Sequence, residues 1–163
     1  MPAPTPPPRI VPYDHPAHAQ PWKRLNEAWI GANFAIEAKD REVLDDPQGK
    51  IVAKGGHILM LLDGEGDDAP AIGCIALIPM ADGGFEVAKM TVAQAARGRG
   101  LGRMLMAACI DKAEALGAPR LYLETNSRLA PALALYRAMG FVDMDPQPSE
   151  YARCDVWMER STR

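Results

Sequence analysis

The chain has 163 residues, of which 48% are hydrophobic and 24% are charged, and its formal net charge is −3. This length supplies one substantial hydrophobic core and favours a single domain. The acidic balance excludes a broad basic surface for nucleic acid, and no uninterrupted apolar stretch approaches the roughly 20 residues that a membrane-spanning helix needs. We therefore expect a cytoplasmic protein with no nucleic-acid or membrane partner.

The N-terminal half of the chain begins with a proline-rich segment. Five prolines lie among residues 1–9, which lack the apolar run of a secretory signal, so we expect a flexible extension there and one domain over residues 10–163. Apolar spacing and turn residues predict the elements that follow. They are a short strand near residues 10–11, a helix over 19–30, a helical segment over 38–44, a loop over 45–49, and strands over 57–63 and 71–79.

An apolar stripe lies on the first predicted helix and just beyond it. Trp22, Leu25, Trp29 and Phe34 are spaced three, four and five residues apart, which indicates core packing. The alternative is that Trp29 or Phe34 forms a wall of a substrate pocket.

The second half of the chain alternates strands with helices. Gly117 and Pro119 end one helix, and Pro131 begins another that Gly140 ends. The predicted elements are strands over residues 85–92, 120–125, 141–144 and 151–158, and helices over 101–116 and 131–139.

A glycine-rich run, Arg97-Gly98-Arg99-Gly100-Leu101-Gly102, connects the strand over 85–92 to the following helix. Glycines let backbone N–H groups approach an anion, and the start of a helix carries partial positive charge, so the run is typical of a pyrophosphate site. No Gly-Lys-Ser/Thr follows, which argues against a nucleoside-triphosphate loop, and the spacing differs from the G-x-G-x-x-G of dinucleotide domains. A plain strand-to-helix turn is the structural alternative.

Four segments, in order along the chain, resemble a GCN5-related N-acetyltransferase (GNAT). They are Phe85-Glu-Val-Ala-Lys-Met-Thr-Val92, the loop over 97–102, Leu123-Glu-Thr-Asn126, and Ala134-Leu-Tyr-Arg-Ala-Met-Gly-Phe141. The acyl-CoA loop pattern of that family, Arg/Gln-x-x-Gly-x-Gly/Ala, is met by Arg97, Gly100 and Gly102. The resemblance implies an α/β (α+β) GNAT fold, with a central mixed, mostly antiparallel sheet of about 6–7 strands flanked by about 4 helices.

The resemblance also implies the cosubstrate, acetyl-CoA, in a split between the strand ending at Val92 and the one ending near Thr125. The loop amides would bind the pyrophosphate, and exposed backbone groups would pair with the pantetheine arm as an added strand does. Asn126 either bonds that arm or caps the next turn. The expected binding residues are Met90, Val92, Arg97, Gly98, Arg99, Gly100, Leu101, Gly102 and Asn126.

Two residues are candidates for acid–base chemistry. Tyr136 lies where the family has a tyrosine that protonates the departing thiolate, and its alternative is a core tyrosine. Glu86 is the candidate base or water relay, because strand alternation places it on the face of Met90 and Val92; its alternative is an exposed strand residue. Lys89 has the opposite parity and is left out. The oxyanion donor is expected to be a backbone N–H near Met90.

The remaining expectations concern metals, thiols and partners. His15, His18 and His57 form no ligand cluster, so catalysis is expected to need no metal. Three widely spaced cysteines, Cys74, Cys109 and Cys154, indicate reduced core thiols.

The function that these residues predict is transfer of an acetyl group from acetyl-CoA to a primary amine of a small molecule or amino acid. A protein N-acetyltransferase, a noncatalytic acyl-CoA sensor and a nucleotide-binding module are the alternatives. Glu150 and Arg153 either select among charged acceptors or are ordinary surface charges, and a homodimer is compatible with the family.

Overall fold

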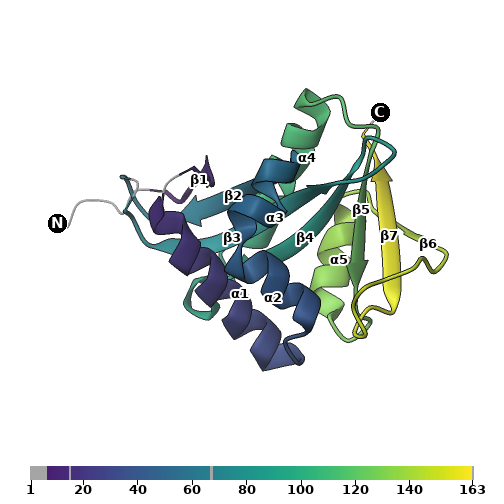
Figure 1. Cartoon of the computed structure of the whole chain (residues 1–163), viewed down its shortest axis with the longest axis horizontal. Helices are drawn as coiled ribbons and strands as arrows, with labels where there is room; N and C mark the ends of the chain where they lie inside the picture. The colour runs from purple at the N-terminus through teal and green to yellow at the C-terminus, as the bar shows by residue number, and fades with distance from the viewer. Residues whose placement is uncertain (1–6, 15, 67, 163) are drawn as a thin grey trace.

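The computed structural model describes residues 7–14, 16–66 and 68–162. Within these ranges, seven strands form one sheet in the order β1-β2-β3-β4-β5-β7-β6, with helices on both faces (Figure 1). The strands are β1 (Arg9–Pro12), β2 (His57–Leu62), β3 (Ala71–Pro79), β4 (Phe85–Val92), β5 (Arg120–Thr125), β6 (Val142–Met144) and β7 (Val156–Ser161). Neighbouring strands are antiparallel except β4 and β5, which confirms the predicted fold class.

The helices follow the apolar periodicity of the sequence. The α-helices are α1 (Ala19–Asn33), α2 (Ala38–Asp45), α3 (Pro47–Lys50), α4 (Leu101–Ala115) and α5 (Ala130–Ala138), and the 3₁₀ helices are η1 (Pro16–His18), η2 (Val52–Lys54) and η3 (Gln94–Ala96). No helix in the described ranges is both long and apolar enough to cross a bilayer.

Two apolar cores lie on opposite faces of the sheet (Figure 1). Helices α4 and α5 bury Leu105, Cys109 and Leu133 against one face. Helices α1 and α2 bury Trp22 and Leu44 against the other. Each core removes large aliphatic and aromatic side chains from water, which is the main favourable term in folding.

Most helix boundaries differ from the sequence predictions by one to three residues, and a few differences have a clear physical reason. Residues 47–50 are a single-turn helix rather than a loop, because Asp46 accepts a hydrogen bond from the Gly49 amide, 2.9 Å away, and Pro47 suits the first turn. Arg9 already belongs to β1, whereas residues 1–6 of the predicted extension lie outside the described residues. Strand β6 begins one residue later than predicted, at Val142.

The last strand shows the largest difference. Strand β7 begins at Val156, so residues 151–155 are not part of a strand. Here the alternation of residue types was misleading, because Tyr151 binds Lys89 of β4 and Arg153 binds Asp40 of α2 through their side chains instead of pairing in a ladder.

Strands β4 and β5 separate soon after they meet. Their parallel pairing joins only Phe85 to Leu121 and Glu86 to Tyr122. From Val87 onward, β4 has no ladder partner on its β5 side, and the sheet opens into a split. This confirms the predicted split between the strands that end at Val92 and Thr125.

Strand β4 also contains a bulge. Its register with β3 shifts so that Cys74 faces Thr91 while Ala76 faces Ala88, which leaves Lys89 and Met90 opposite Ile75. Lys89 has a φ of 56°, a left-handed conformation that is costly for a residue with a Cβ. The bulge bends β4 at the point where it has left β5.

Candidate active site

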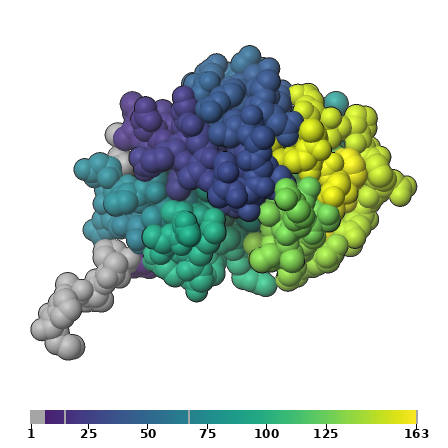
Figure 2. Space-filling model, turned by 90° about the horizontal axis from the view of Figure 1, so that it is seen from below, coloured from purple at the N-terminus to yellow at the C-terminus, as the bar shows by residue number. Residues whose placement is uncertain are grey.

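A cavity of about 340 Å³ occupies the split between β4 and β5. Its walls come from α1, β4, β5, α5 and the segment before β7. Seen from below, the N-terminal helices, the segment leading into α4 and the beginning of α5 border one another on this face (Figure 2). The cavity is therefore bounded by segments from every part of the chain.

One end of the cavity meets the glycine-rich run. Arg97 lines the cavity, and Gly98 and Gly100 have φ values of 82° and 74°. A Cβ on either glycine would have no atom within 4 Å, so their positive φ rather than crowding requires glycine. Within the described residues, the backbone N–H groups of 98–103 make no hydrogen bond, and no side chain caps α4. Unpaired amides at a helix start fit a pyrophosphate group.

The other residues of the run have different surroundings. Arg99 pairs with Asp63 across an exposed 3.3 Å contact, so its guanidinium is directed toward the β2–β3 connection. Leu101 is buried in the α4 core. A Cβ on Gly102 would lie 3.4 Å from Leu135, which favours a small residue where α4 passes α5.

Glu86 lines the cavity and has no hydrogen bond or ion pair within the described residues. Burial, reinforced by the negative charge of Glu124, raises the pKa of Glu86 to about 7. Glu124 is held in place, because it accepts a hydrogen bond from the Tyr122 hydroxyl at 2.9 Å and another from Ser149. Glu86 is thus an unpaired carboxyl group that can exchange a proton near neutral pH.

Tyr136 lines the same cavity from α5. Its ring packs against Phe141, with centroids 6.1 Å apart, and its hydroxyl makes no hydrogen bond within the described part of the chain. Burial raises the pKa of Tyr136 to about 12. The phenol therefore keeps its proton at physiological pH and can donate it to a basic group.

Asn126 lines the cavity, but both polar atoms of its side chain already have backbone partners. Its Nδ2 donates to the Arg153 carbonyl at 2.7 Å, and its Oδ1 accepts from the Arg128 amide at 2.9 Å. These bonds match the turn-capping alternative. Contact between Asn126 and a pantetheine arm stays a prediction.

The bulge overturns the strand-parity argument. Glu86 pairs with Ile78 and Thr91 with Cys74, on the face covered by α1 and α2. Met90 and Val92 pack into the core on the α4 face instead. The prediction that Glu86 shares a face with Met90 and Val92 is wrong, because the extra residue of the bulge reverses the alternation.

Lys89 was left out for the same mistaken reason. Its ammonium lies on the α2 side, 2.7 Å from Oδ1 of Asp40, and its residue lines the cavity. Alternation cannot be carried through a bulge that the sequence gives no sign of.

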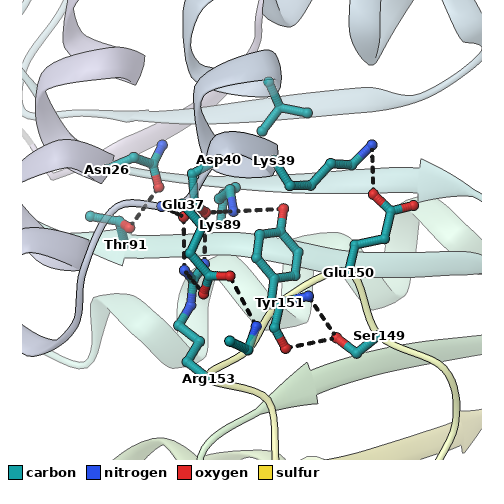
Figure 3. Close-up of polar contacts among 12 residues, drawn as sticks. Asn26, Glu37, Lys39, Asp40, Lys89, Thr91, Ser149, Glu150, Tyr151 and Arg153 are labelled. Carbon is teal, nitrogen blue, oxygen red and sulfur yellow. Dashed lines mark hydrogen bonds and ion pairs between the residues drawn. The ribbon is translucent and has the colours of Figure 1, made fainter.

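An ionic cluster, formed by Glu37, Asp40, Lys89, Tyr151 and Arg153 (Figure 3), lies at the end of the cavity that Lys89, Tyr151 and Arg153 line. Asp40 is fully buried and accepts hydrogen bonds from Lys89 at 2.7 Å and from Arg153 at 2.7 and 2.8 Å. Lys89 also donates to the Tyr151 hydroxyl at 3.2 Å. Two carboxylates and two cations make the cluster neutral.

The cluster sets its own protonation states. Burial alone would raise the pKa of Asp40, but the hydrogen bonds from Arg153 and Lys89 outweigh it and hold that pKa well below the usual range. Burial lowers the pKa of Lys89, and Asp40 opposes that shift. Asp40 is therefore ionised at neutral pH and compensates the buried cations.

Aromatic rings complete this end of the cavity. Trp29, Phe34 and Tyr151 all line it, so Trp29 and Phe34 belong to the pocket wall as well as to the edge of the core. The Arg153 guanidinium lies 4.5 Å from the Tyr151 ring centre, and that of Arg128 lies 4.6 Å from the Phe34 ring centre. Arginine stacked on aromatic rings makes a rigid wall.

The cysteines divide between core and cavity. Cys74 and Cys109 are buried, as predicted, whereas Cys154 is half-buried and lines the cavity. Burial raises the pKa of the Cys154 thiol, with a further contribution from Glu124.

The geometry of the split and of the glycine-rich loop agrees with the sequence comparison. Residues 20–141 match the profile of the Acetyltransferase (GNAT) family. The chain belongs to that family. Among its relatives, the uncharacterized N-acetyltransferase YjgM of Escherichia coli K12 is 28% identical over 141 residues, which cover 84% of this chain and 81% of YjgM.

Solved GNAT structures share the fold of this acetyltransferase. An acetyltransferase of the family from Staphylococcus aureus Mu50 superposes with a TM-score of 0.85 at 17% identity, over 96% of this chain and 99% of that one. The yncA protein of Salmonella typhimurium, solved with its cofactor acetyl-CoA, gives a TM-score of 0.73 at 19% identity, over 96% of this chain and 94% of that one.

Sequence reasoning about this GNAT acetyltransferase missed most of the ionic cluster. Asp40 lies on a short charged helix, where an acidic residue normally faces solvent, and it is 49 residues from Lys89 and 113 from Arg153. The one available signal was the pair Glu37 and Asp40, which forms a capping box at the start of α2. A capping box predicts only where a helix begins, and it does not predict that Asp40 binds Lys89 and Arg153.

Asp40→Asn should destabilise the protein by about 3–5 kcal/mol at pH 7, because the buried Lys89 and Arg153 then lack a full counter-charge. The folded-state pKa of Asp40 is lowered, so its contribution is present above the unfolded pKa of about 4 and lost as the pH falls below it. Urea unfolding of the parent protein and of Asp40→Asn at several pH values measures the difference between their free energies of unfolding. That difference should shrink in acid, and a difference that grows in acid would contradict the prediction. Asp45→Asn, in an exposed pair with Lys23, serves as the control and should leave the midpoint nearly unchanged.

Proposed function

We propose that this acetyltransferase transfers the acetyl group of acetyl-CoA to the primary amine of a small molecule or amino acid, by direct attack in a ternary complex. The observation that carries the proposal is that one cavity, opened by the separation of β4 and β5, is lined both by an unpaired carboxyl group with a pKa of about 7 and by a buried phenol with a pKa of about 12. A group that accepts a proton and a group that donates one are the two that amine acetylation needs.

Acetyl-CoA is proposed to lie along the split, with its pyrophosphate at the start of α4. The unpaired amides of 98–103 and the cation Arg97 support this placement. The edge of β4 from Val87 to Val92 lacks a strand partner on the β5 side, so its backbone can pair with the pantetheine amides. The glycine-rich run alone would fit other diphosphates. The unpaired edge of β4 favours CoA, because it can also bind the pantetheine amides.

The acceptor amine is proposed to bind between Glu86 and the aromatic end of the cavity. An ammonium group cannot attack a carbonyl, so Glu86 takes its proton, directly or through a water. The free amine then forms a bond to the thioester carbon, and the carbonyl oxygen gains the charge. When the tetrahedral intermediate collapses, the carbon–sulfur bond breaks, the nitrogen gives up its second proton, and Tyr136 protonates the CoA thiolate. The proton from the nitrogen restores the Tyr136 hydroxyl, directly or through a water. The products are an N-acetyl amine and CoA.

The size of the cavity supports a small acceptor. A volume of about 340 Å³ is at the low end of ligand pockets and must also take the thioester end of acetyl-CoA. A protein N-terminus or lysine side chain would have to enter past the Phe34 and Tyr151 walls.

The decisive experiment measures CoA release from acetyl-CoA with a panel of primary amines, amino acids and peptides. We expect small amines to be acetylated and Tyr136→Phe to lower turnover by about 100-fold or more, because the leaving thiolate loses its acid. Calorimetric binding of acetyl-CoA to the same variant should be unchanged. If acetyl-CoA binds and no amine or peptide is acetylated, the protein is an acyl-CoA sensor and the proposal fails.

The pH dependence should identify the base. Because Glu86 must be ionised to accept a proton and burial holds its pKa near 7, kcat/KM should rise with pH through about 7. Glu86→Gln should remove that inflection and leave only the one that belongs to the amine itself. A profile that keeps its inflection near 7 in Glu86→Gln would assign the base elsewhere.

Gly100→Ala should weaken acetyl-CoA binding about tenfold, since a side chain at φ 74° is strained and relief of that strain would move the free amides of the loop. Gly117→Ala is a closely matched control. Gly117 has a φ of 73°, has no neighbour within 4 Å of a Cβ, and lies at the other end of α4. Both variants should lose similar stability, and only the first should lose affinity in calorimetry; equal affinities would remove the loop from the binding site.

A further inference from the structure

The bulge in β4 is held from outside the strand. Lys89 is the only residue other than glycine with a positive φ in the described part of the chain. A left-handed residue with a Cβ persists only when its surroundings hold it there. The contacts of Lys89 and of its neighbours show what does so.

Asp40 provides the contact with the ammonium of Lys89. The two charges are 2.7 Å apart, and their side chains are 0% and 6% exposed. Asp40 is itself fixed, because its Oδ2 accepts from the Glu37 amide at 2.8 Å and Arg153 holds both of its oxygens. A buried ammonium that left this carboxylate would lose its counter-charge and keep only the Tyr151 hydroxyl as a partner, so the pair keeps residue 89 on the α2 side of the sheet (Figure 3).

The residue after the bulge is fixed to the same helical layer, and the bulge itself is bonded to β3. Thr91 donates a hydrogen bond to Asn26 of α1 at 3.1 Å, and both residues are buried. The Cys74 thiol lies 3.6 Å from the Lys89 carbonyl and donates to it. Met90, between these anchored residues, has its side chain in the α4 core and its backbone at the edge of the cavity. The anchors on Lys89 and Thr91 therefore fix the peptide units around Met90.

The geometry points to Asp40 and Lys89 as positioning residues for acetyl transfer: Asp40 holds Lys89 on the α2 side and so fixes the β4 bulge that sets the Met90 backbone at the edge of the cavity. This inference rests on the proposed function. Neither side chain needs to touch the reacting atoms. The bulge also sets the spacing between Glu86, which precedes it, and the Met90 peptide, which belongs to it. A carboxylate and a backbone donor that act on one reaction centre lose much of their effect when they are misplaced by about 1 Å.

Two substitutions at one position separate the backbone effect from the loss of charge. Lys89→Met removes the ammonium and keeps the strained Cβ, so the bulge loses its anchor. Lys89→Gly removes the same ammonium, but glycine adopts a positive φ without strain and is the preferred first residue of one common bulge type. In both variants Asp40 keeps its two-point pairing with Arg153, so neither leaves a buried carboxylate unpaired. Lys39→Met, in an exposed pair with Glu150, is the control lysine.

Steady-state kinetics, with acetyl-CoA and the best amine of the panel, give the first readout. We expect Lys89→Met to lower kcat about tenfold to 100-fold, with KM for acetyl-CoA within about twofold. Lys89→Gly should recover most of kcat, and Lys39→Met should match the parent protein. Equal losses in Lys89→Met and Lys89→Gly, or a loss confined to KM, would overturn the inference.

Hydrogen exchange of the amides of residues 88–91 gives a second readout that needs no acceptor. Lys89→Met should accelerate exchange there, while Lys89→Gly should stay closer to the parent protein than Lys89→Met does. Unchanged exchange in Lys89→Met would show that Asp40 and Lys89 do not hold the bulge. If the exchange results hold and no amine is acetylated, the bulge is held as described and the proposed function alone has failed.

Discussion

The sheet is continuous across its centre through only two residue pairs, Phe85 with Leu121 and Glu86 with Tyr122. All other features of the site depend on this weak connection. Where the ladder stops, backbone groups of β4 have no strand partner on the β5 side, and the gap becomes a cavity. The two halves of the sheet must then be held together by other contacts. At one end of the cavity α4 does this, because its buried side chains reach strands of both halves.

At the opposite end of the cavity the ionic cluster joins the two halves. Arg153 comes from the segment before β7, Asp40 from α2 and Lys89 from β4, so one buried carboxylate connects three elements. A buried ion pair stabilises a fold little more than a well-packed apolar pair would, so the main contribution of this cluster is to fix the positions of its residues. Here the geometry includes a bulge, an aromatic wall and the distance across the split. The neutrality of the cluster also leaves Glu86 without a strong ion-pair partner, which is consistent with its near-neutral pKa.

Most of the fold followed from the sequence, and the reasons differ by element. Strands β3, β4 and β5 have the predicted ends, because each is a short, largely apolar run that begins directly after a proline or a glycine. The glycine-rich run was found because its conformation depends on local sequence. The faces of β4 were misassigned because a bulge depends on tertiary contacts of Lys89. The start of β7 was misplaced for the same reason, since Tyr151 and Arg153 make their contacts with residues more than 60 positions away.

The long sequence separations in the ionic cluster also bear on the order in which the molecule is assembled. Strands β2, β3 and β4 follow one another along the chain and can pair as soon as they are made. Asp40 emerges early during synthesis, but burying its charge is costly until Lys89 and Arg153 are both present. Arg153 follows Asp40 by 113 residues. Helix α2 can therefore complete its docking on the sheet only after the chain has been synthesised as far as Arg153, so the end of the cavity beside the ionic cluster closes late.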